Sequence, residues 1–337
     1  MNLLGLSFAP LFIPIERRLQ TLATFIWMGS FLCGAVIGAS VLLYLLCYTS
    51  YWWISLVYIS WFVVDRNSCN KGGRTISWMR DLRIWTYFRD FFPVELVKTV
   101  ELDPEKTYLF TSQPHGVMCA GAFVSFATNA LSFSKLFNGL HSRLLVLEGQ
   151  FWFPIYREFL ISLGACSASK SSMTYLLENE KNAAIVLVTG GVLEAMENNK
   201  NVMRLVLNRR KGFIKLAIKH GVPLVPTFTF GENFIYDIIN NPVGSLLRKI
   251  QEFSEKKFSF SPILFNGRGI FQYSYGIVPR RKKLTVVVGS PMDIPRDEDP
   301  SRELIEETHS KFVDSVQKLY NEYNPKYGDP KMSLVVS

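Results

Sequence analysis

One histidine of the chain stands in a setting that suits acid–base chemistry. His115 follows an apolar run that predicts a buried strand, and it is held between Pro114 and Gly116. Proline fixes its own φ and favours an extended residue before it, and glycine allows a sharp turn and a close approach of a ligand. A neutral imidazole at such a position can accept a proton from an alcohol. A histidine satisfied inside the core is the alternative interpretation.

A second candidate site follows another apolar run and consists of Gly190, Gly191 and Glu194. Two glycines free the backbone N–H groups to face a ligand. The carboxylate of Glu194 can orient an imidazole or a substrate hydroxyl. A surface glutamate just after a turn is the alternative at this place.

The stretch from Arg204 to Lys219 holds six basic residues and no acidic one. Its middle opens a predicted helix with Arg210, Lys211, Gly212 and Phe213, so that side-chain charge and a helix N-terminus coincide. That pairing is typical of phosphate binding, although a solvated basic face has the same composition. The run at 280–283 can contact anionic lipid or form an exposed loop.

Several other chemistries lack their motifs. The four histidines do not pair with each other or with cysteine at a metal-ligand spacing, so the sequence predicts no metal site. No dinucleotide-binding or P-loop glycine pattern is present, and there is no nucleophile elbow. Cys119 and Cys166 lie among small apolar residues, where an inert buried thiol is expected.

The elements that must position these residues alternate between strands and helices. Apolar runs predict strands over 107–111, 143–147, 183–188, 224–230 and 284–288, and helices over 122–133, 156–163, 169–178, 212–220 and 301–323. The strand runs are continuously apolar, which predicts an α/β fold with a mostly parallel sheet covered by helices on both faces. Functional groups gather at strand ends in such sheets.

The composition leaves room for a membrane anchor beside a globular core. Of 337 residues, 48% are hydrophobic and only 19% are charged, which excludes disorder over most of the chain. The net charge of +9 suits nucleic acid, anionic lipid or a substrate that carries phosphate.

An uncharged stretch from Leu19 to Val64 is about twice the length of one bilayer-spanning helix. It predicts a transmembrane helical hairpin with helices over 22–46 and 51–64. Basic residues flank both ends, so the positive-inside rule places both ends in the cytosol. A pair of buried helices in a soluble core is the alternative.

We therefore expect four regions. These are a cytosolic N-terminal segment (1–21), a membrane hairpin (22–64), a membrane-surface linker (65–106) and an α/β domain (107–337). The linker mixes aromatic and basic residues, a pattern also typical of single-stranded nucleic-acid binding. Beside a membrane hairpin it favours a segment that lies on the lipid surface, and no nucleic-acid partner is predicted.

The chain resembles the type-2 diacylglycerol acyltransferase family, which includes monoacylglycerol acyltransferases and wax-ester synthases. The resemblance covers nearly the whole chain, and several separate blocks carry it in the same order. They are Gly72-Gly73-Arg74, Phe92-Pro93, Pro114-His115-Gly116, Arg157-Glu158, Gly190-Gly191 with Glu194, Arg210-Lys211-Gly212-Phe213, Val225-Pro226, Phe230-Gly231-Glu232-Asn233, Gly267-Arg268-Gly269 and Val288-Gly289. Phe8-Ala9-Pro10, residues 16–21 and residues 268–273 look most like the monoacylglycerol acyltransferase branch.

The resemblance implies an enzyme of the endoplasmic reticulum membrane that moves a fatty acyl group from acyl-CoA to a neutral acylglycerol. His115 would be the general base, with Glu194 as its orienting acid. Backbone N–H groups near Gly116 or Gly190-Gly191 would stabilise the oxyanion. Substrate contacts are expected from the residues next to these, which are Gln113, Pro114, Gly116, Gly190, Gly191, Arg210, Lys211, Gly212 and Phe213.

The same resemblance implies a multi-pass protein with a cytosolic catalytic domain. It leaves room for association with lipid droplets and for a homo-oligomer. Acyl-CoA is a co-substrate, and no cofactor is expected. Diacylglycerol or a fatty alcohol as acceptor and a catalytically inactive lipid-binding relative are the alternatives.

The chain departs from the family pattern at several places. The family motif usually reads His-Pro-His-Gly, and the first histidine is Gln113 here. Gln113 cannot act as a base, but it can donate or accept a hydrogen bond. Related glycerolipid acyltransferases carry aspartate five residues after the catalytic histidine, where this chain has Ala120.

Overall fold

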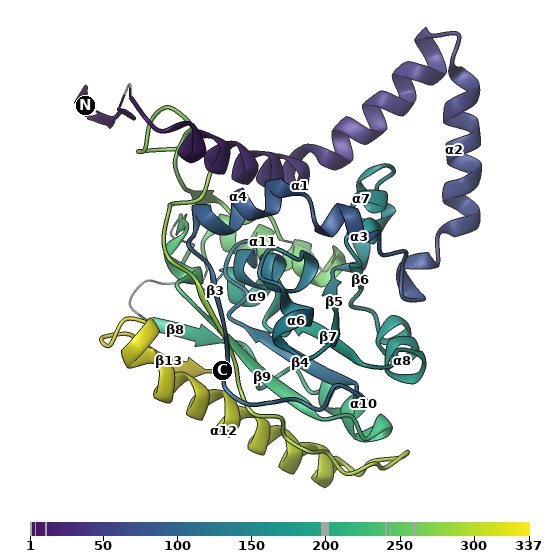
Figure 1. The fold of residues 1–337 in the computed structure, drawn as a ribbon, viewed down its shortest axis with the longest axis vertical. Helices are drawn as coiled ribbons and strands as arrows, with labels where there is room; N and C mark the ends of the chain where they lie inside the picture. Colours follow the sequence, from purple (N-terminus) through teal and green to yellow (C-terminus); the bar gives the residue numbers. More distant parts are fainter. Residues whose placement is uncertain are drawn as a thin grey trace.

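A seven-stranded sheet lies at the centre of the molecule (Figure 1). The computed structural model describes residues 2–3, 5–10, 12–196, 202–239, 241–242, 244–258 and 261–337. The strand order is β3-β12-β9-β4-β7-β5-β6, and the five strands from β9 to β6 are parallel. At one edge, β12 runs antiparallel to β9 and parallel to β3. The prediction of a mostly parallel α/β sheet is confirmed.

The strands of this sheet are short and buried at its centre. Their bounds are β3 Glu95–Lys98, β4 Tyr108–Gln113, β5 His141–Val146, β6 Cys166–Ser167, β7 Ala183–Val188, β9 Leu224–Phe230 and β12 Thr285–Val288. Three two-stranded pairs lie outside it, formed by β1 Asn2–Leu3 with β2 Leu6–Ser7, β8 Val202–Leu205 with β13 Ser333–Val336, and β10 Asp237–Ile238 with β11 Phe265–Asn266.

Helices cover both faces of the sheet and form two cores. One core includes side chains from α1 (Ile15–Tyr48), α4 (Arg83–Phe91) and α6 (Phe133–Leu136). The other includes side chains from α8 (Lys170–Asn179), α10 (Gly212–His220) and α12 (Arg302–Tyr327). The remaining helices are α2 Trp52–Asp65, α3 Ser77–Arg80, α5 Ala120–Ala122, α7 Tyr156–Ser162, α9 Gly191–Met196 and α11 Leu246–Phe258, with short turns η1 Ser68–Asn70, η2 Phe123–Ala127, η3 Glu148–Trp152 and η4 Glu232–Phe234.

One predicted helix is broken in the structure. Instead of a continuous helix over 122–133, α5 passes into the π-helical turn η2, and a separate α6 follows. The buried Arg80 and the hydroxyl of Ser142 both donate to the carbonyl oxygen of Phe126, at 3.0 and 2.6 Å. Thr128 is then extended. These tertiary hydrogen bonds occupy the carbonyl oxygen of Phe126, which in a continuous helix would accept from a backbone N–H four residues later.

The N-terminal apolar stretch forms a long helix followed by a shorter one. Within the described residues, α1 is the one helix whose length and apolar composition suit a bilayer crossing. Its first part packs on the domain, where Trp27 lies 4.8 Å from the ring of Phe88. Its second part rises away from the domain, and α2 returns toward it (Figure 1). The predicted hairpin over 22–64 therefore differs from the structure, because its beginning belongs to the core of the domain.

The returning helix ends in an ion-pair cluster on the domain. Asp65, the last residue of α2, accepts hydrogen bonds from Arg74 and from the fully buried Arg157, the latter at 2.8 Å. Arg74 also pairs with Glu158 at 2.9 Å. The two arginines hold the pKa of Asp65 below its usual value despite its burial. The cluster fixes the base of the projecting arm to α7.

The segment 65–106, expected to be a linker on the membrane surface, contributes a helix and a strand to the α/β domain. Its helix α4 packs under α1 and buries Trp85, Phe88 and Phe91. Its strand β3 pairs with β12 as an edge strand of the main sheet. The sheet therefore begins before residue 107, in the segment expected to be a linker.

Candidate active site

Three neighbouring parallel strands end at the same edge of the sheet and deliver three titratable side chains. The central strand β4 leads into His115. Its two neighbours, β7 and β9, lead into Glu194 and Glu232. Strand order therefore places one imidazole between two loops that each carry a glutamate.

The imidazole of His115 has one nitrogen committed to the main chain. Nδ1 lies 2.9 Å from the carbonyl oxygen of Gly116, which can only accept, so Nδ1 carries the proton and Nε2 keeps its lone pair. Burial lowers the pKa of His115, and the nearby charge of Arg210 lowers it further. The residue is still partly exposed. A neutral ring with an available Nε2 is the form that a general base needs.

Glu194 holds the main chain of His115 rather than its ring. Its carboxylate accepts from the backbone N–H of His115 at 2.7 Å and from that of Val206 at 3.3 Å. The side chain is almost fully buried, and this burial raises its pKa to about 7. Glu194 thus positions the histidine through the backbone, whereas a contact with the imidazole was expected from the sequence.

Glu232 is a second buried carboxylate, which the sequence interpretation missed as a site residue. It accepts from the backbone N–H groups of Ala120 and Gly121 at 2.8 and 3.0 Å. Burial raises its pKa to about 7 as well. Its carboxylate contacts the main chain of Ala120, the position at which related glycerolipid acyltransferases carry aspartate. The sequence did contain a signal for this residue, because Glu232 directly follows the apolar run 224–230 and Gly231.

Three glycines allow this close packing. A methyl group at Gly116 would lie 2.6 Å from Cγ of Glu232, and one at Gly190 would overlap the carboxylate of Glu194. Gly116 and Gly191 also have φ of +56° and +62°, which glycine adopts without strain. Gly116 and Gly190, predicted as ligand contacts, are therefore required first by the two carboxylates, and Gly191 is required by its backbone conformation.

Gln113 and Pro114 lie inside the protein. Gln113 is fully buried, and its amide lies 3.0 Å from the hydroxyl of Thr189. In the orientation that satisfies every group, the amide nitrogen donates to the carbonyl oxygens of Thr111 and Thr227, at 2.9 and 2.8 Å. The amide oxygen then accepts from the hydroxyl of Thr189. Gln113 therefore ties three strand ends together. Gln113 was expected as a substrate contact, and in the structure its amide is buried and bonded to the protein's own groups.

Only part of the predicted phosphate-binding stretch faces the site. The guanidinium of Arg210 lies 3.4 Å from the place of a Cβ on Gly191 and acts electrostatically on both His115 and Glu194. Lys211 pairs with Glu306 instead. Phe213, expected as a substrate contact, is buried in the core against Phe312. Gly212 begins α10 and is exposed.

Other candidate nucleophiles and bases near the site have structural contacts. The thiol of Cys119 lies 3.1 Å from the carbonyl oxygen of His115, and burial raises its pKa well above the ordinary value. It is therefore a protonated thiol at neutral pH. His141 pairs with Glu180 at 2.7 Å, and His309 lies 3.0 Å from the carbonyl oxygen of Leu207.

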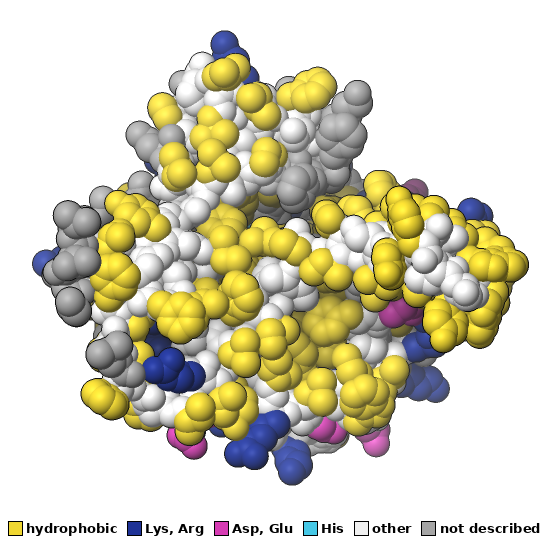
Figure 2. Space-filling view, turned by 90° about the horizontal axis from the view of Figure 1, so that it is seen from above, with side chains coloured by type: hydrophobic (Ala, Val, Ile, Leu, Met, Phe, Trp, Pro, Cys, Tyr) yellow, Lys and Arg dark blue, Asp and Glu magenta, His cyan; other side chains and the backbone are white. Residues whose placement is uncertain are grey.

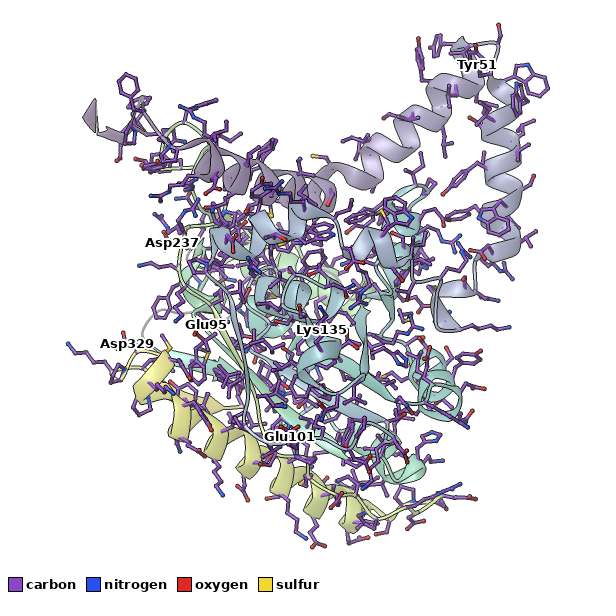
Figure 3. All side chains as sticks on the ribbon, viewed as in Figure 1. Tyr51, Glu95, Glu101, Lys135, Asp237 and Asp329 are labelled. Carbon is purple, nitrogen blue, oxygen red and sulfur yellow. The ribbon has the colours of Figure 1, made fainter. Side chains whose placement is uncertain are left out.

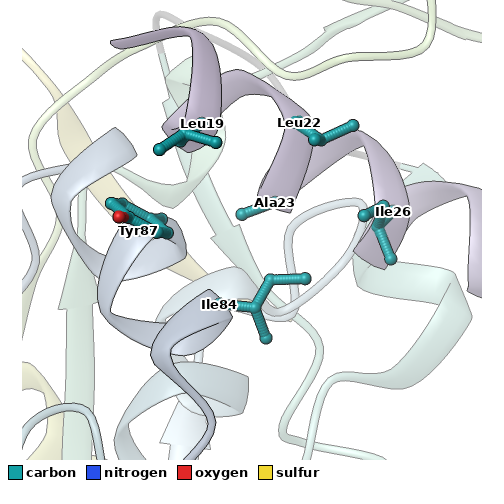
Figure 4. Close-up of a pocket in the computed structure, with 6 residues that line it drawn as sticks. All are labelled: Leu19, Leu22, Ala23, Ile26, Ile84 and Tyr87. Atoms are coloured by element: carbon teal, nitrogen blue, oxygen red, sulfur yellow. The ribbon is translucent and has the colours of Figure 1, made fainter. Parts of the chain in front are cut away.

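Two grooves of the molecule lie away from His115. One, of about 200 Å³, is lined by apolar side chains of α1 and α4 (Figure 4). The other, of about 330 Å³, lies at the opposite ends of the central strands, between Lys106 and Ile294. Neither includes His115, so the site is identified by its chemistry and not by the size of an opening.

Comparison with known proteins gives consistent matches over the chain. The profile of a family described as diacylglycerol acyltransferase matches residues 44–337. The chain is 42% identical over 331 residues to 2-acylglycerol O-acyltransferase 1 of Bos taurus, covering 98% of each. It is 39% identical over 323 residues to diacylglycerol O-acyltransferase 2 of Homo sapiens, covering 95% of this chain and 83% of that protein.

A solved structure gives a weaker match. The 1-acyl-sn-glycerophosphate acyltransferase of Thermotoga maritima aligns with 90% of this chain and 97% of its own, at a TM-score of 0.41 and 11% identity. That likeness is too low to bear on the fold. Between the two kinds of sequence relatives the identity differs by only 42 − 39 = 3 percentage points, which does not select an acceptor.

Proposed function

The chain belongs to the diacylglycerol acyltransferase family, and from this premise we propose that it transfers a fatty acyl group from acyl-CoA to a hydroxyl of monoacylglycerol, forming diacylglycerol. The observation that carries the proposal is the imidazole of His115, whose Nε2 keeps a lone pair at the end of the central strand. The blocks at residues 8–10, 16–21 and 268–273, which look most like the monoacylglycerol acyltransferase branch, support monoacylglycerol as the acceptor.

The reaction needs one proton transfer to His115 and one from it. Nε2 of His115 takes the proton of the acceptor hydroxyl as its oxygen attacks the thioester carbonyl. The tetrahedral intermediate then expels the thiolate of coenzyme A, which takes the proton back from the imidazolium. Because the thioester is already activated, no acyl-enzyme is required. Backbone N–H groups near Gly116 or Gly190-Gly191 would stabilise the oxyanion.

Charge at the site supports acyl-CoA as the donor. Arg210 is the basic residue of the 209–213 segment that lies beside Gly191 and near His115. A guanidinium can bind a phosphate oxygen of coenzyme A in a bidentate manner. Lys211 has a carboxylate partner, so we assign the donor contact to Arg210 first.

The membrane arm supports a lipid acceptor. Large apolar side chains are exposed along the second part of α1 and along α2, and Figure 2 shows hydrophobic atoms over much of this face. We propose that the arm enters the membrane of the endoplasmic reticulum, with both ends cytosolic. At 14 residues, or about 21 Å, α2 is shorter than a bilayer core of about 30 Å.

An accessibility experiment tests this topology. Tyr51 lies at the tip of the arm (Figure 3), so a Tyr51→Cys variant with Cys33 and Cys47 changed to serine reports on that tip. A membrane-impermeant maleimide should not label it in intact microsomes. Labelling there at the rate of an exposed cytosolic cysteine would contradict insertion of the arm.

An acceptor panel tests the reaction. Purified protein is given labelled oleoyl-CoA with 2-monooleoylglycerol, dioleoylglycerol or hexadecanol. We expect the highest kcat/KM with the monoacylglycerol. Transfer to dioleoylglycerol or hexadecanol without transfer to monoacylglycerol would overturn the acceptor and leave the family chemistry intact.

A paired substitution tests the base. His115→Ala should lower kcat by about 10²- to 10⁴-fold, the usual contribution of a general base. His220→Ala is the matched control, because His220 ends α10 in the last helical turn. Activity that survives His115→Ala unchanged would exclude the mechanism.

A further inference from the structure

Three arginines from distant parts of the chain converge beside the start of α1. They are Arg17 in its first turn, Arg268 and Arg281. The guanidinium groups of Arg268 and Arg281 lie 5.4 and 4.3 Å from the centre of the Phe91 ring. We call Arg17, Arg268 and Arg281 the arginine cluster.

The hydrogen-bond partners of the cluster within the described residues are neutral groups. In the part of the chain that the structure describes, no carboxylate pairs with any of its three members. Arg268 donates to the hydroxyl of Thr21 at 2.9 Å, and Arg281 donates to the amide oxygen of Gln20. The Nε–H groups of both arginines are buried without an acceptor among these residues.

Like charges in such proximity are costly. Burial lowers the pKa of Arg281 to about 10, and the neighbouring charges of Arg17 and Arg268 contribute to this. Burial and the charge of Arg17 also lower the pKa of Arg268. An anion bound among the three would offset this repulsion and supply the missing acceptors.

The structure separates this cluster from the rest of the basic run at 280–283. Arg280 pairs with Asp237, and Lys283 pairs with Glu95 at 2.9 Å. In the view of Figure 3, both acidic residues lie on the flank of the domain below α1. Lys282 is exposed. Of the four basic residues, Arg281 is the one that turns toward Arg17 and Arg268.

Exposed apolar side chains surround the cluster. Phe12 and Ile15, which lead into α1, are 96% and 69% exposed, and Phe271 on the loop after Arg268 is 69% exposed. That loop is tied to the N-terminal segment, because Ala9 donates its backbone N–H to the carbonyl oxygen of Phe271 at 2.9 Å. Apolar side chains around guanidinium groups suit a lipid–water boundary. There the apolar side chains enter the acyl layer, and the guanidinium groups bind phosphate.

We propose that Arg17, Arg268 and Arg281 form a binding site for the phosphate of a membrane phospholipid headgroup, placed beside the first turns of α1, where the domain faces the membrane surface. The soluble phosphates of coenzyme A are the other source of the same chemistry. The exposed Phe12, Ile15 and Phe271 favour the lipid, because a soluble ligand would leave these side chains in water.

Lipid retention by the full chain tests the proposal. Protein in a mild non-ionic detergent is mixed with dioleoylphosphatidylglycerol, or with dioleoylglycerol as a ligand that has the same acyl chains and no phosphate. Native mass spectrometry then counts bound lipid. The variants are Arg281→Gln and Arg17→Gln, and the matched control is Lys282→Gln, which removes one charge from the same run. Arg17 is exposed, so its replacement leaves the fold intact even if Arg281→Gln does not.

We expect the native chain to retain phosphatidylglycerol beyond its retention of dioleoylglycerol. Each cluster variant should lose roughly fivefold in apparent affinity, the usual effect of one basic residue at an anionic surface. Lys282→Gln should bind like the native chain. Equal retention of the two lipids, or equal losses in Lys282→Gln and the cluster variants, would overturn the proposal.

A second measurement distinguishes the two sources of phosphate. The KM for oleoyl-CoA should be unchanged in Arg17→Gln, since Arg210 is the proposed donor contact. Displacement of phosphatidylglycerol by free coenzyme A, together with a raised KM for oleoyl-CoA in Arg17→Gln, would assign the cluster to the donor and overturn the headgroup site. Because lipid retention is read without turnover, it is independent of the proposed reaction.

Discussion

The loops after β7 and β9 flank the same histidine, and each buries a glutamate, but they hold different parts of the chain. Glu194 accepts from the backbone N–H of His115 itself, whereas Glu232 accepts from Ala120 and Gly121, at the start of α5. Arg210 acts on Glu194, and no cation is among the groups that shift the pKa of Glu232. One loop therefore controls the position of His115, and the other controls the helix that follows it.

The largest difference should come from removing each carboxylate. Glu194→Ala frees the main chain of His115, and a misplacement of about 1 Å costs on the order of 100-fold in rate. Glu232→Ala acts through α5, and we expect about a tenfold loss in kcat, or roughly 1.4 kcal/mol. Steady-state kinetics below the unfolding temperature of both variants measures this, with Glu194→Gln as a partial rescue. Equal losses in the two alanine variants would remove the distinction.

The pH dependence of stability tests a property that the two carboxylates share, which is their raised pKa. Both have a pKa of about 7 in the folded protein, above the value of 4.5 for an ordinary glutamate. The folded state then binds protons that the unfolded state has lost, so the free energy of unfolding should fall as pH rises from about 4.5 to 7. Each group contributes about 1.4 kcal/mol per pH unit at most.

Thermal unfolding in detergent across this pH range measures the effect. Glu194→Gln and Glu232→Gln should each remove part of the slope, because an amide does not titrate. If the pH slope of both glutamine variants equals that of the native chain between pH 4.5 and 7, neither carboxylate is protonated in the folded protein.

Arg210→Gln should separate the two loops electrostatically. Arg210 lowers the pKa of both His115 and Glu194, so its removal should raise both values. The acid limb of kcat/KM, which follows deprotonation of His115, should move to higher pH. Arg209→Gln is the control, because Arg209 is exposed and is not among the groups that act on either residue. An equal shift in both variants would point to net charge rather than to proximity.

The smallest effect is expected at Gln113. This side chain lies between the strand ends and does not face a ligand, so Gln113→His should change kcat by less than about threefold, under 1 kcal/mol. Thermal unfolding of Gln113→Leu should show a loss of stability of about 1–3 kcal/mol, because the hydroxyl of Thr189 loses its buried partner. A gain of tenfold or more in Gln113→His would show that the first position of the motif takes part in the reaction.

Local features of the sequence determined where chemistry can occur. Continuous apolar runs predicted the strands 183–188 and 224–230 at their observed bounds, and Pro114 and Gly116 marked the turn that carries His115. These features are set by residues close together in the chain, since backbone preference and burial of a strand are local. The uncharged stretch likewise predicted the apolar helices α1 and α2, and the ordered blocks of residues placed the chain in its family.

Only the tertiary structure decided which of these residues meet. The neighbours of β4 follow from packing of the whole sheet, so Glu232 joined the site while Gln113 and Phe213 turned into the interior. The same reason applies to Arg17, Arg268 and Arg281, which no spacing in the sequence relates. Contacts between distant segments depend on how the cores fill, and a pattern that extends over a few residues carries no information about that.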